Sequence, residues 1–214
     1  MKRPETHYDD AYFQWQSQNM YIQAKANAFK FEAYVKPAMV VLDFGCGSGA
    51  LLRELGGGLG VEINPAAREI ARKNGIDVYS ELSQVEEESV DIVISNHAIE
   101  HVERPLDAIR EMYRILKPGG RMIIVAPIDA ATVPYRQNDK DFHLYSWSAG
   151  NLGNLASAAG FEVEKAERIL HSWPPSWALI QRTFGWKLFH LFSRLWAIID
   201  WRRRQVRVVA RKSQ

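Results

Sequence analysis

A glycine-rich stretch near the start of the chain constrains the fold more than any other feature. Residues 40–49 read Val-Val-Leu-Asp-Phe-Gly-Cys-Gly-Ser-Gly, and a helical run resumes at 50–55. The apolar start is typical of a buried parallel strand. The alternating glycines let the backbone approach a ligand closely, and free N–H groups at the start of the next helix point toward it. The stretch predicts a nucleotide-binding turn at the carboxyl end of a strand, with Asp43 beside it.

The glycine turn is compatible with more than one function. Gly45, Gly47 and Ala50 also satisfy the dinucleotide fingerprint, in which alanine can replace the third glycine. A tight strand-to-helix turn that binds nothing is a further interpretation. The other motifs have to separate these interpretations.

Composition is typical of a globular α/β protein. The 214 residues suffice for one α/β domain with elaborations, and an apolar content of 47% excludes wholesale disorder. The net charge of +2 is too small to indicate a nucleic-acid partner. Cys46 is the one cysteine, which excludes an internal disulfide and fits a reducing cytosol. No His or Lys adjoins it, so we expect a small buried side chain rather than a nucleophile. The first residues lack the apolar core of a signal peptide, so we expect a cytoplasmic protein.

Strands and helices alternate along the chain, which predicts a parallel sheet with helices on both faces. Strands are expected at 40–42, 59–63, 76–79, 90–94, 121–126, 161–169 and 205–211. Helices are expected at 19–34, 50–55, 65–74, from 105 to a turn at 117–120, and from a Ser148 cap to 159. We expect residues 1–36 to form an N-terminal helical cap and 37–214 to form one domain, with an aromatic helical insert at about 171–201.

An acidic residue lies at the end of the second predicted strand. Glu62 follows Leu-Gly-Val in the chain. A carboxylate at this distance from the glycine turn can accept hydrogen bonds from ribose hydroxyls. A surface glutamate is the alternative, and the position at the carboxyl end of a strand argues against it.

Two histidines follow the fourth predicted strand. His97 and His101 flank the run His-Ala-Ile-Glu-His, a spacing that would place both on one helix face and would suit zinc. The order differs from His-Glu-x-x-His, and no third ligand is evident. We therefore predict no metal site.

Four segments resemble, in order and spacing, the motifs of the class I S-adenosylmethionine (SAM)-dependent methyltransferases. They are 41–49 (first motif), 60–63 (acidic second-strand motif), 91–96 with 98–102 (fourth-strand segment) and 116–120 (turn before the fifth strand). The resemblance covers about residues 38–168. It implies a Rossmann-like, doubly wound seven-stranded sheet of order 3-2-1-4-5-7-6 with helices on both faces. Residues 205–211 would be the antiparallel last strand, and the insert before it is larger than in the family's commonest form.

The resemblance also implies roles for the motif residues. SAM would be the methyl donor and S-adenosyl-L-homocysteine (SAH) the product. The glycine turn would pass the methionine part, Glu62 would hold the ribose hydroxyls and Ile63 would pack on the adenine. The implied cofactor-binding residues are Asp43, Gly45, Cys46, Gly47, Gly49, Glu62, Ile63, Asn96 and His97.

A second, narrower resemblance concerns the acceptor. Segments 8–36 and 143–147 are similar to a bacterial subgroup of polysaccharide and cell-envelope biosynthesis. This implies methylation on oxygen of a small-molecule, saccharide or lipid-linked glycan acceptor. His143 is the first candidate for a general base. The alternative is that His143 only forms hydrogen bonds within its own loop. His97 is the second candidate, and we expect His101 to be structural.

Three other classes of protein share parts of this pattern. An NAD-dependent oxidoreductase would explain the glycines and Glu62, but not Asp43, the turn at 117–120 or the final strand. A nucleic-acid or protein methyltransferase would share the cofactor site, and the basic tail at 202–212 could bind phosphate, although charge runs are usually solvated. A non-catalytic SAM-binding module would also share it. We expect no nucleic-acid partner.

The aromatic segments permit several interpretations. We expect most aromatic residues of the N-terminal segment to pack against the sheet, and the alternative is a lid over the ligand, for which Tyr12 and Trp15 are the candidates. In the insert, Pro174-Pro175 breaks the chain, Ser176 can cap a helix, and apolar residues follow at helical spacing. Charged residues interrupt the run, so no membrane-spanning helix is predicted. We expect the stripe to pack on the protein or to form a lid. A homodimer contact and peripheral contact with the inner face of a membrane are the alternatives.

Overall fold

The computed structural model describes residues 20–129, 134–137, 139, 141–200 and 204–214. The lid candidates Tyr12 and Trp15 lie outside these residues, as does the part of the predicted cap that precedes Met20.

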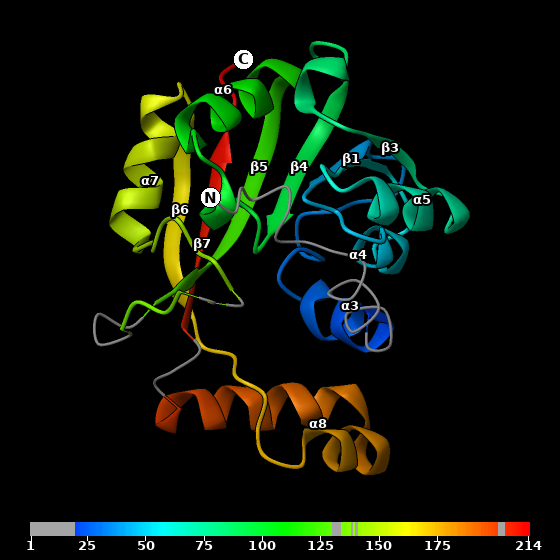
Figure 1. Ribbon diagram of the computed structural model, residues 1–214, viewed down its shortest axis with the longest axis vertical. Helices are drawn as coiled ribbons and strands as arrows, with labels where there is room; N and C mark the ends of the chain where they lie inside the picture. Colours follow the sequence, from blue (N-terminus) through cyan, green and yellow to red (C-terminus); the bar gives the residue numbers. More distant parts are fainter. Residues whose placement is uncertain (1–19, 130–133, 138, 140, 201–203) are drawn as a thin grey trace.

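The described residues contain one seven-stranded sheet in the order β3-β2-β1-β4-β5-β7-β6 (Figure 1). Strands β1 to β5 pair in parallel, and β7 is antiparallel to both β5 and β6. This order and these directions confirm the predicted sheet. The strands are β1 (Val41–Phe44), β2 (Leu59–Val61), β3 (Asp77–Tyr79), β4 (Val90–Asn96), β5 (Leu116–Ile128), β6 (Glu162–Ile169) and β7 (Arg204–Arg211).

Helices cover both faces of the sheet. On one face, Ile109 and Leu152 share a buried cluster with Ile124 of β5. On the other face, Phe31 and Leu52 share a second cluster with Ile123, because successive side chains of a strand point to opposite faces. The elements are α3 (Met20–Ala28), α4 (Ala50–Glu54), α5 (Pro65–Lys73), η1 (Leu82–Gln84), η2 (Ile99–His101), α6 (Pro105–Ile115), α7 (Ala149–Ala158) and α8 (Trp177–Ile199).

The first described helix is shorter than predicted. Helix α3 ends at Ala28, and turns rather than helix occupy residues 29–34. The turns bring Lys30 and Phe31 to complete burial. The burial of these two side chains therefore outweighs the helical preference of the segment.

The predicted turn at 117–120 is part of a strand. Strand β5 begins at Leu116, which pairs with Val90, and the register shifts between Val90 and Ile92. Residues 117–120 are the extra residues of β5 between these two pairs, and they form an irregularity in the strand pair. Gly119 there has a φ of 77°. Lys117 fastens this end because its Nζ donates to Asp91 Oδ1 at 2.8 Å.

Ser148 caps α7 as predicted. Its Oγ accepts from the Asn151 N–H at 3.1 Å, and Asn151 Oδ1 accepts from the Ser148 N–H at 2.7 Å. This reciprocal capping box fixes the end of the loop that connects β5 to α7.

The carboxyl ends of β1 to β6 share one edge of the sheet, because β6 runs parallel to β5 on the far side of antiparallel β7. The glycine turn, His97 and the loop after Ile128 follow strands that end at this edge. Figure 1 shows α8 lying across the same edge, beyond the ends of β5, β6 and β7. The predicted site residues therefore lie where ligands bind in open α/β sheets.

Helix α8 contacts the segment that precedes it and the Phe29 side chain, which directly follows α3. The Ser172 N–H donates to Ser193 O at 3.1 Å. His171 Nε2 lies 3.1 Å from His190 Nδ1, and the Phe29 ring lies 4.6 Å from the His171 ring. Burial lowers the pKa of His171 to about 3, so its ring is neutral and can share one hydrogen bond with His190.

The apolar stripe of α8 faces solvent, so the prediction that it packs on the protein is wrong. The buried residues of α8 are Phe189, Ser193 and Ala197. Ser193 and Ala197 have small side chains, so the segment before α8 can approach the helix closely at this narrow face. The exposed large apolar residues of the helix are Leu179, Phe184, Leu188, Leu191, Phe192, Leu195, Ile198 and Ile199.

Two local features of α8 differ from a regular capped helix. Ser176 stands at the N-cap position with a φ of 58° and makes no side-chain capping bond, so its predicted capping role is wrong. Gly185, at a φ of 74°, divides α8 into two segments. Within the described ranges, no helix has both the length and the apolar character needed to cross a membrane.

Candidate cofactor and acceptor site

The glycine turn after β1 leaves no room for a side chain at Gly45. Gly45 has a φ of 77°, and a Cβ there would lie 2.5 Å from the Ala98 Cβ. On the other side of the turn, a Cβ at Gly60 would lie 2.5 Å from Cys46 Sγ. The Gly45 N–H donates to Val61 O at 2.8 Å, which ties the turn to β2. Glycine is therefore required at 45 and 60 by close packing.

Glu62 binds the glycine turn from the end of β2. Its Oε2 accepts from the Gly47 N–H at 3.0 Å, and its Oε1 accepts from the Asn64 N–H at 2.8 Å. Burial raises the pKa of Glu62, and the two N–H groups oppose this shift. The next residue, Ile63, is 54% exposed and offers an apolar surface beside the carboxylate.

Asp43 is a buried acid at the end of β1 whose Oδ1 has no hydrogen-bond partner among the described residues. Burial, with Glu62 nearby, raises the pKa of Asp43 well above its usual value. An orphaned buried oxygen beside a glycine turn calls for a donor group from a ligand. Cys46 is buried, as predicted, and burial raises the pKa of its thiol, which disfavours the reactive thiolate.

A buried lysine that the sequence analysis missed reaches the end of β4. Lys30 Nζ donates to Asn96 Oδ1 at 2.9 Å, and the lysine is fully buried. Burial lowers its pKa to about 7. The available signal was a lysine between two phenylalanines, in Phe29-Lys30-Phe31, where an apolar residue would be expected.

The zinc interpretation assumed that His97 and His101 share one face of a helix. In the structure they do not. His97 has a φ of 58° and its N–H donates to Val125 O at 2.8 Å, whereas the short η2 helix begins only at Ile99. The His97 side chain is 36% exposed, but desolvation of the ring by the surrounding protein, with Lys30 nearby, lowers its pKa, so the imidazole is neutral at pH 7. Its Nδ1 lies 3.7 Å from Glu100 Oε1.

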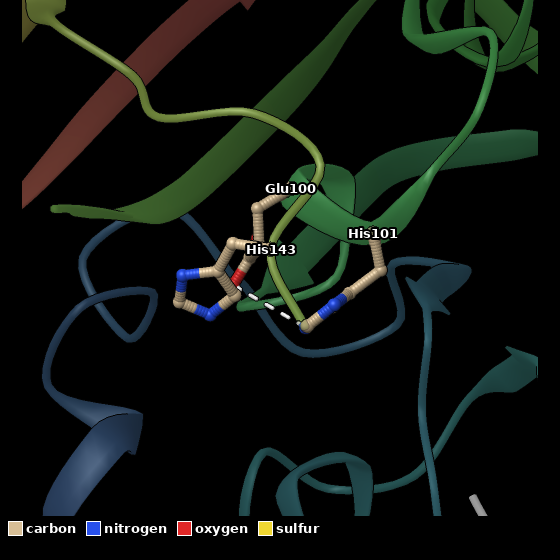
Figure 2. Close-up of side chains that lie close together, drawn as sticks. All are labelled: Glu100, His101 and His143. Atoms are coloured by element: carbon tan, nitrogen blue, oxygen red, sulfur yellow. Dashed lines mark ion pairs between the residues drawn. The ribbon is translucent and has the colours of Figure 1, made fainter. Parts of the chain in front are cut away.

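Glu100, His101 and His143 converge at the carboxyl edge (Figure 2). Glu100 is completely buried, and neither carboxylate oxygen has a hydrogen-bond partner among the described residues. Its Oε1 lies 3.9 Å from His101 Nε2. Burial raises the pKa of Glu100 to about 7. The result is a compact group of ionisable side chains drawn from two separate segments.

The loop after β5 brings His143 to this group. Asp129 Oδ2 lies 2.9 Å from His143 Nδ1, which fixes the orientation of the ring. The N–H groups of Leu144 and Tyr145 donate to Glu100 O at 2.9 and 3.2 Å. The loop is thus fastened to η2 through its backbone, so the His143 side chain is positioned rather than merely nearby.

The structure places the predicted residues in two adjoining sets. Asp43, Glu62 and Ile63 surround the glycine turn, and the second set is the histidine group with Glu100. The segment from Asn96 to His101 joins them, because Ala98 packs against Gly45. The sequence analysis missed Asp129, the partner of His143, which directly follows the observed end of β5 and lies three residues beyond the predicted strand.

Comparison with known proteins identifies the class of this chain. The family described as methyltransferase domain matches residues 18–166. The chain therefore belongs to the class I SAM-dependent methyltransferase family, and the Rossmann-like sheet order agrees with this assignment. SAM is the cofactor that defines the family.

Curated relatives resemble this chain over part of their length. A protein of Mycolicibacterium smegmatis, named as a probable SAM-dependent methyltransferase, is 30% identical over 141 residues, which cover 61% of this chain and 55% of that protein. Chloroplastic tocopherol O-methyltransferase of Arabidopsis thaliana is 29% identical over 180 residues, covering 69% of this chain and 51% of the relative. The chain spans about half the length of these relatives.

Solved structures share the fold at low identity. A SAM-dependent methyltransferase from Archaeoglobus fulgidus has a TM-score of 0.67 at 20% identity, with 95% of this chain and 100% of that chain covered. The [4+2]-cyclase SpnF has a TM-score of 0.63 at 19% identity, with 89% and 81% covered. Because a cyclase shares the fold, the reaction has to be argued from the site.

We predict that Glu62→Ala weakens SAM binding by about 1–3 kcal/mol, because charged hydrogen bonds to the cofactor and to the Gly47 N–H are lost. Isothermal titration calorimetry measures the affinity. Glu69→Ala, which removes an exposed acid of the following helix, is the matched control and should leave the affinity unchanged. Equal SAM affinity in both variants, or tight binding of NAD by the wild type, would contradict the assignment of this site.

Proposed function

We propose that the chain binds SAM at the glycine turn and transfers its methyl group to an oxygen of an acceptor held beside Glu100, His101 and His143. The observation that carries this proposal is the packing of Ala98 against Gly45, which sets the glycine turn directly beside the histidine group. The residues of the turn also fit the cofactor, because the orphaned Asp43 oxygen and the Glu62 carboxylate match the donor groups that SAM offers.

The protein's task in such a reaction is mainly alignment. SAM, when bound, supplies an activated methyl group on a sulfonium. Asp43, the backbone of the glycine turn, Glu62 and Ile63 would hold its amino-acid, ribose and adenine parts. Asn96, oriented by Lys30, would lie beside the sulfonium, with His97 next to it. Holding donor and acceptor in line can supply much of the reduction in the barrier.

His143 is the proposed base for a hydroxyl acceptor. Asp129 occupies its Nδ1, so the remaining ring nitrogen can accept the acceptor proton, as in other carboxylate–imidazole pairs. The acceptor oxygen then forms a bond to the methyl carbon, and the C–S electron pair stays on sulfur. The products are a methyl ether of the acceptor and SAH, whose sulfur is an uncharged thioether.

The proposed acceptor is a small-molecule, saccharide or lipid-linked hydroxyl. The name of the Arabidopsis thaliana relative indicates that it methylates tocopherol, a lipid, on oxygen. The exposed apolar face of α8 lies at the same edge of the sheet as the histidine group, which favours an acceptor with an apolar part. Other relatives include a mouse protein named as a probable tRNA methyltransferase and L11 ribosomal-protein methyltransferases, but the net charge of +2 does not favour a polyanion.

Helix α8 is proposed to rest on an anionic membrane surface. Its exposed face carries eight large apolar side chains. The charged residues between 170 and 199 are Arg182, Lys187 and Arg194, all basic. An apolar face with basic residues at its sides is the chemistry of an interfacial helix. A second copy of the chain or a lid would need no such bias of charge.

We predict that His143→Ala lowers methyl transfer roughly 10²–10⁴-fold while SAM affinity stays unchanged, because the variant removes proton transfer but not the cofactor site. Transfer of labelled methyl to candidate acceptors measures the rate, and calorimetry measures the affinity. Asp129→Asn should lower the rate by a smaller factor, since the ring keeps a neutral partner. Full activity of His143→Ala would show that this histidine only orders its loop.

A second prediction concerns the membrane surface. Wild type should sediment with anionic vesicles at low salt and dissociate at high salt, and the double variant Leu191→Glu with Leu195→Glu should lose the binding. Thr183→Glu adds a charge to the same helix outside the large apolar residues and should weaken binding only slightly. Absence of vesicle binding by the wild type, together with a dimer in analytical ultracentrifugation, would assign the face to a second copy instead.

A further inference from the structure

We propose that Glu100, His101 and His143 form a binding site for a divalent transition-metal cation, to which the acceptor oxygen also binds. The proposal rests on the proposed function and changes the means by which the acceptor proton is removed. The sequence offered no third ligand beside His97 and His101. In the folded chain, His143 joins His101 and Glu100 as a third ligand. His97 does not belong to this group.

The distances fit a cation after a small adjustment of side chains. One ligand atom from each of the three residues lies within 4.8 Å of the others, and His101 Nε2 lies 3.9 Å from Glu100 Oε1. Cations of this kind bind nitrogen and oxygen at about 2.0–2.2 Å, which sets neighbouring ligand atoms about 3.0–3.5 Å apart. Side-chain movements of about 1 Å would close the site around an ion, with no change in the backbone.

The burial of Glu100 supplies an independent reason for a cation. The residue is completely buried, and both of its oxygens lack a hydrogen-bond partner among the described residues. Buried carboxylates are normally hydrogen-bonded, paired or bound to metal, because an unpaired buried charge is costly. Figure 2 shows the Glu100 carboxylate directed toward the two imidazole rings. A cation between them would satisfy the carboxylate.

The outer partners of both histidines are those of metal ligands. Asp129 lies 2.9 Å from His143 Nδ1, and the Phe142 carbonyl lies 3.3 Å from His101 Nδ1. With an acceptor at Nδ1, each ring carries its proton there and presents Nε2 as a ligand atom. Histidines that bind metals almost always donate their other N–H to a carboxylate or a carbonyl in this way. Both residues show the arrangement although they come from different segments.

The site would also be preorganised and would leave positions open for substrate. Backbone bonds from Leu144 and Tyr145 to Glu100 O hold the loop of His143 against η2. Two histidines and one carboxylate occupy three positions, a set that suits Zn²⁺, Fe²⁺, Co²⁺ or Mn²⁺ and leaves others vacant. An acceptor hydroxyl bound there would lose its proton to water at neutral pH. The oxygen would then attack the methyl carbon, and the C–S electron pair would stay on sulfur.

The test measures metal binding directly in the full chain. Protein stripped with a chelator is titrated with Co²⁺, and both calorimetry and the visible absorption of the ion are recorded. The expected result is about one Co²⁺ per chain, with binding lost in Glu100→Gln and in His143→Ala. Asp129→Asn should weaken binding about 10–100-fold, because it removes the outer partner of His143. Glu103→Gln changes a nearby exposed acid and should bind as the wild type does.

The outcomes separate this proposal from the proposed function. SAH binding by each variant shows that it is folded. No Co²⁺ binding by the wild type, or equal binding by Glu100→Gln, would overturn the metal site. Methyl transfer that persists in chelator would then leave the proposed function intact, with His143 as a simple base. Conversely, Co²⁺ binding that depends on Glu100 and His143 supports the site even if no tested acceptor is methylated, which would count against the proposed function alone.

Discussion

The close packing of two turns at the carboxyl edge of the sheet is the constraint on which the rest of the site depends. A side chain at Gly45 would collide with Ala98, whose Cβ would lie 2.5 Å away. Ser95 Oγ donates to Phe44 O at 3.0 Å just below this contact, which fixes the ends of β1 and β4 against each other. Since Asn96 and Glu100 stand on either side of Ala98, one contact sets the glycine turn beside the histidine group.

Buried ionisable groups collect around this contact at a cost to stability. Asp43, Lys30 and Glu100 are all at most 3% exposed, and each loses its hydration. Removing a charge from water costs about several kcal/mol unless partners compensate it. Lys30 has Asn96 as its partner, whereas Asp43 Oδ1 and both Glu100 carboxylate oxygens have no hydrogen-bond partner among the described residues. Such groups are typical of functional sites, where ligands complete the bonding that the protein leaves open.

The sequence was sufficient wherever the determining residues are close together in the chain. The glycine turn, the acid that follows β2 and the Ser148 cap each depend on a few neighbouring residues, and the motifs implied the sheet order. Pairs between distant segments were missed: Lys30 meets Asn96 across 66 positions, and Asp129 meets His143 across 14. The stripe on α8 was assigned to the wrong surroundings because helical periodicity identifies an apolar face and not what covers it.

A crystal structure of the chain with SAH tests the central claim most directly, because that claim is about the relative placement of the two sets of residues. The account predicts that the ribose hydroxyls bind the Glu62 carboxylate and that a donor group of the amino-acid part reaches Asp43. It also predicts that the sulfur lies beside Asn96, on the side of the turn that faces Glu100, His101 and His143. SAH bound away from the glycine turn, or with its sulfur directed away from the histidine group, would contradict the account.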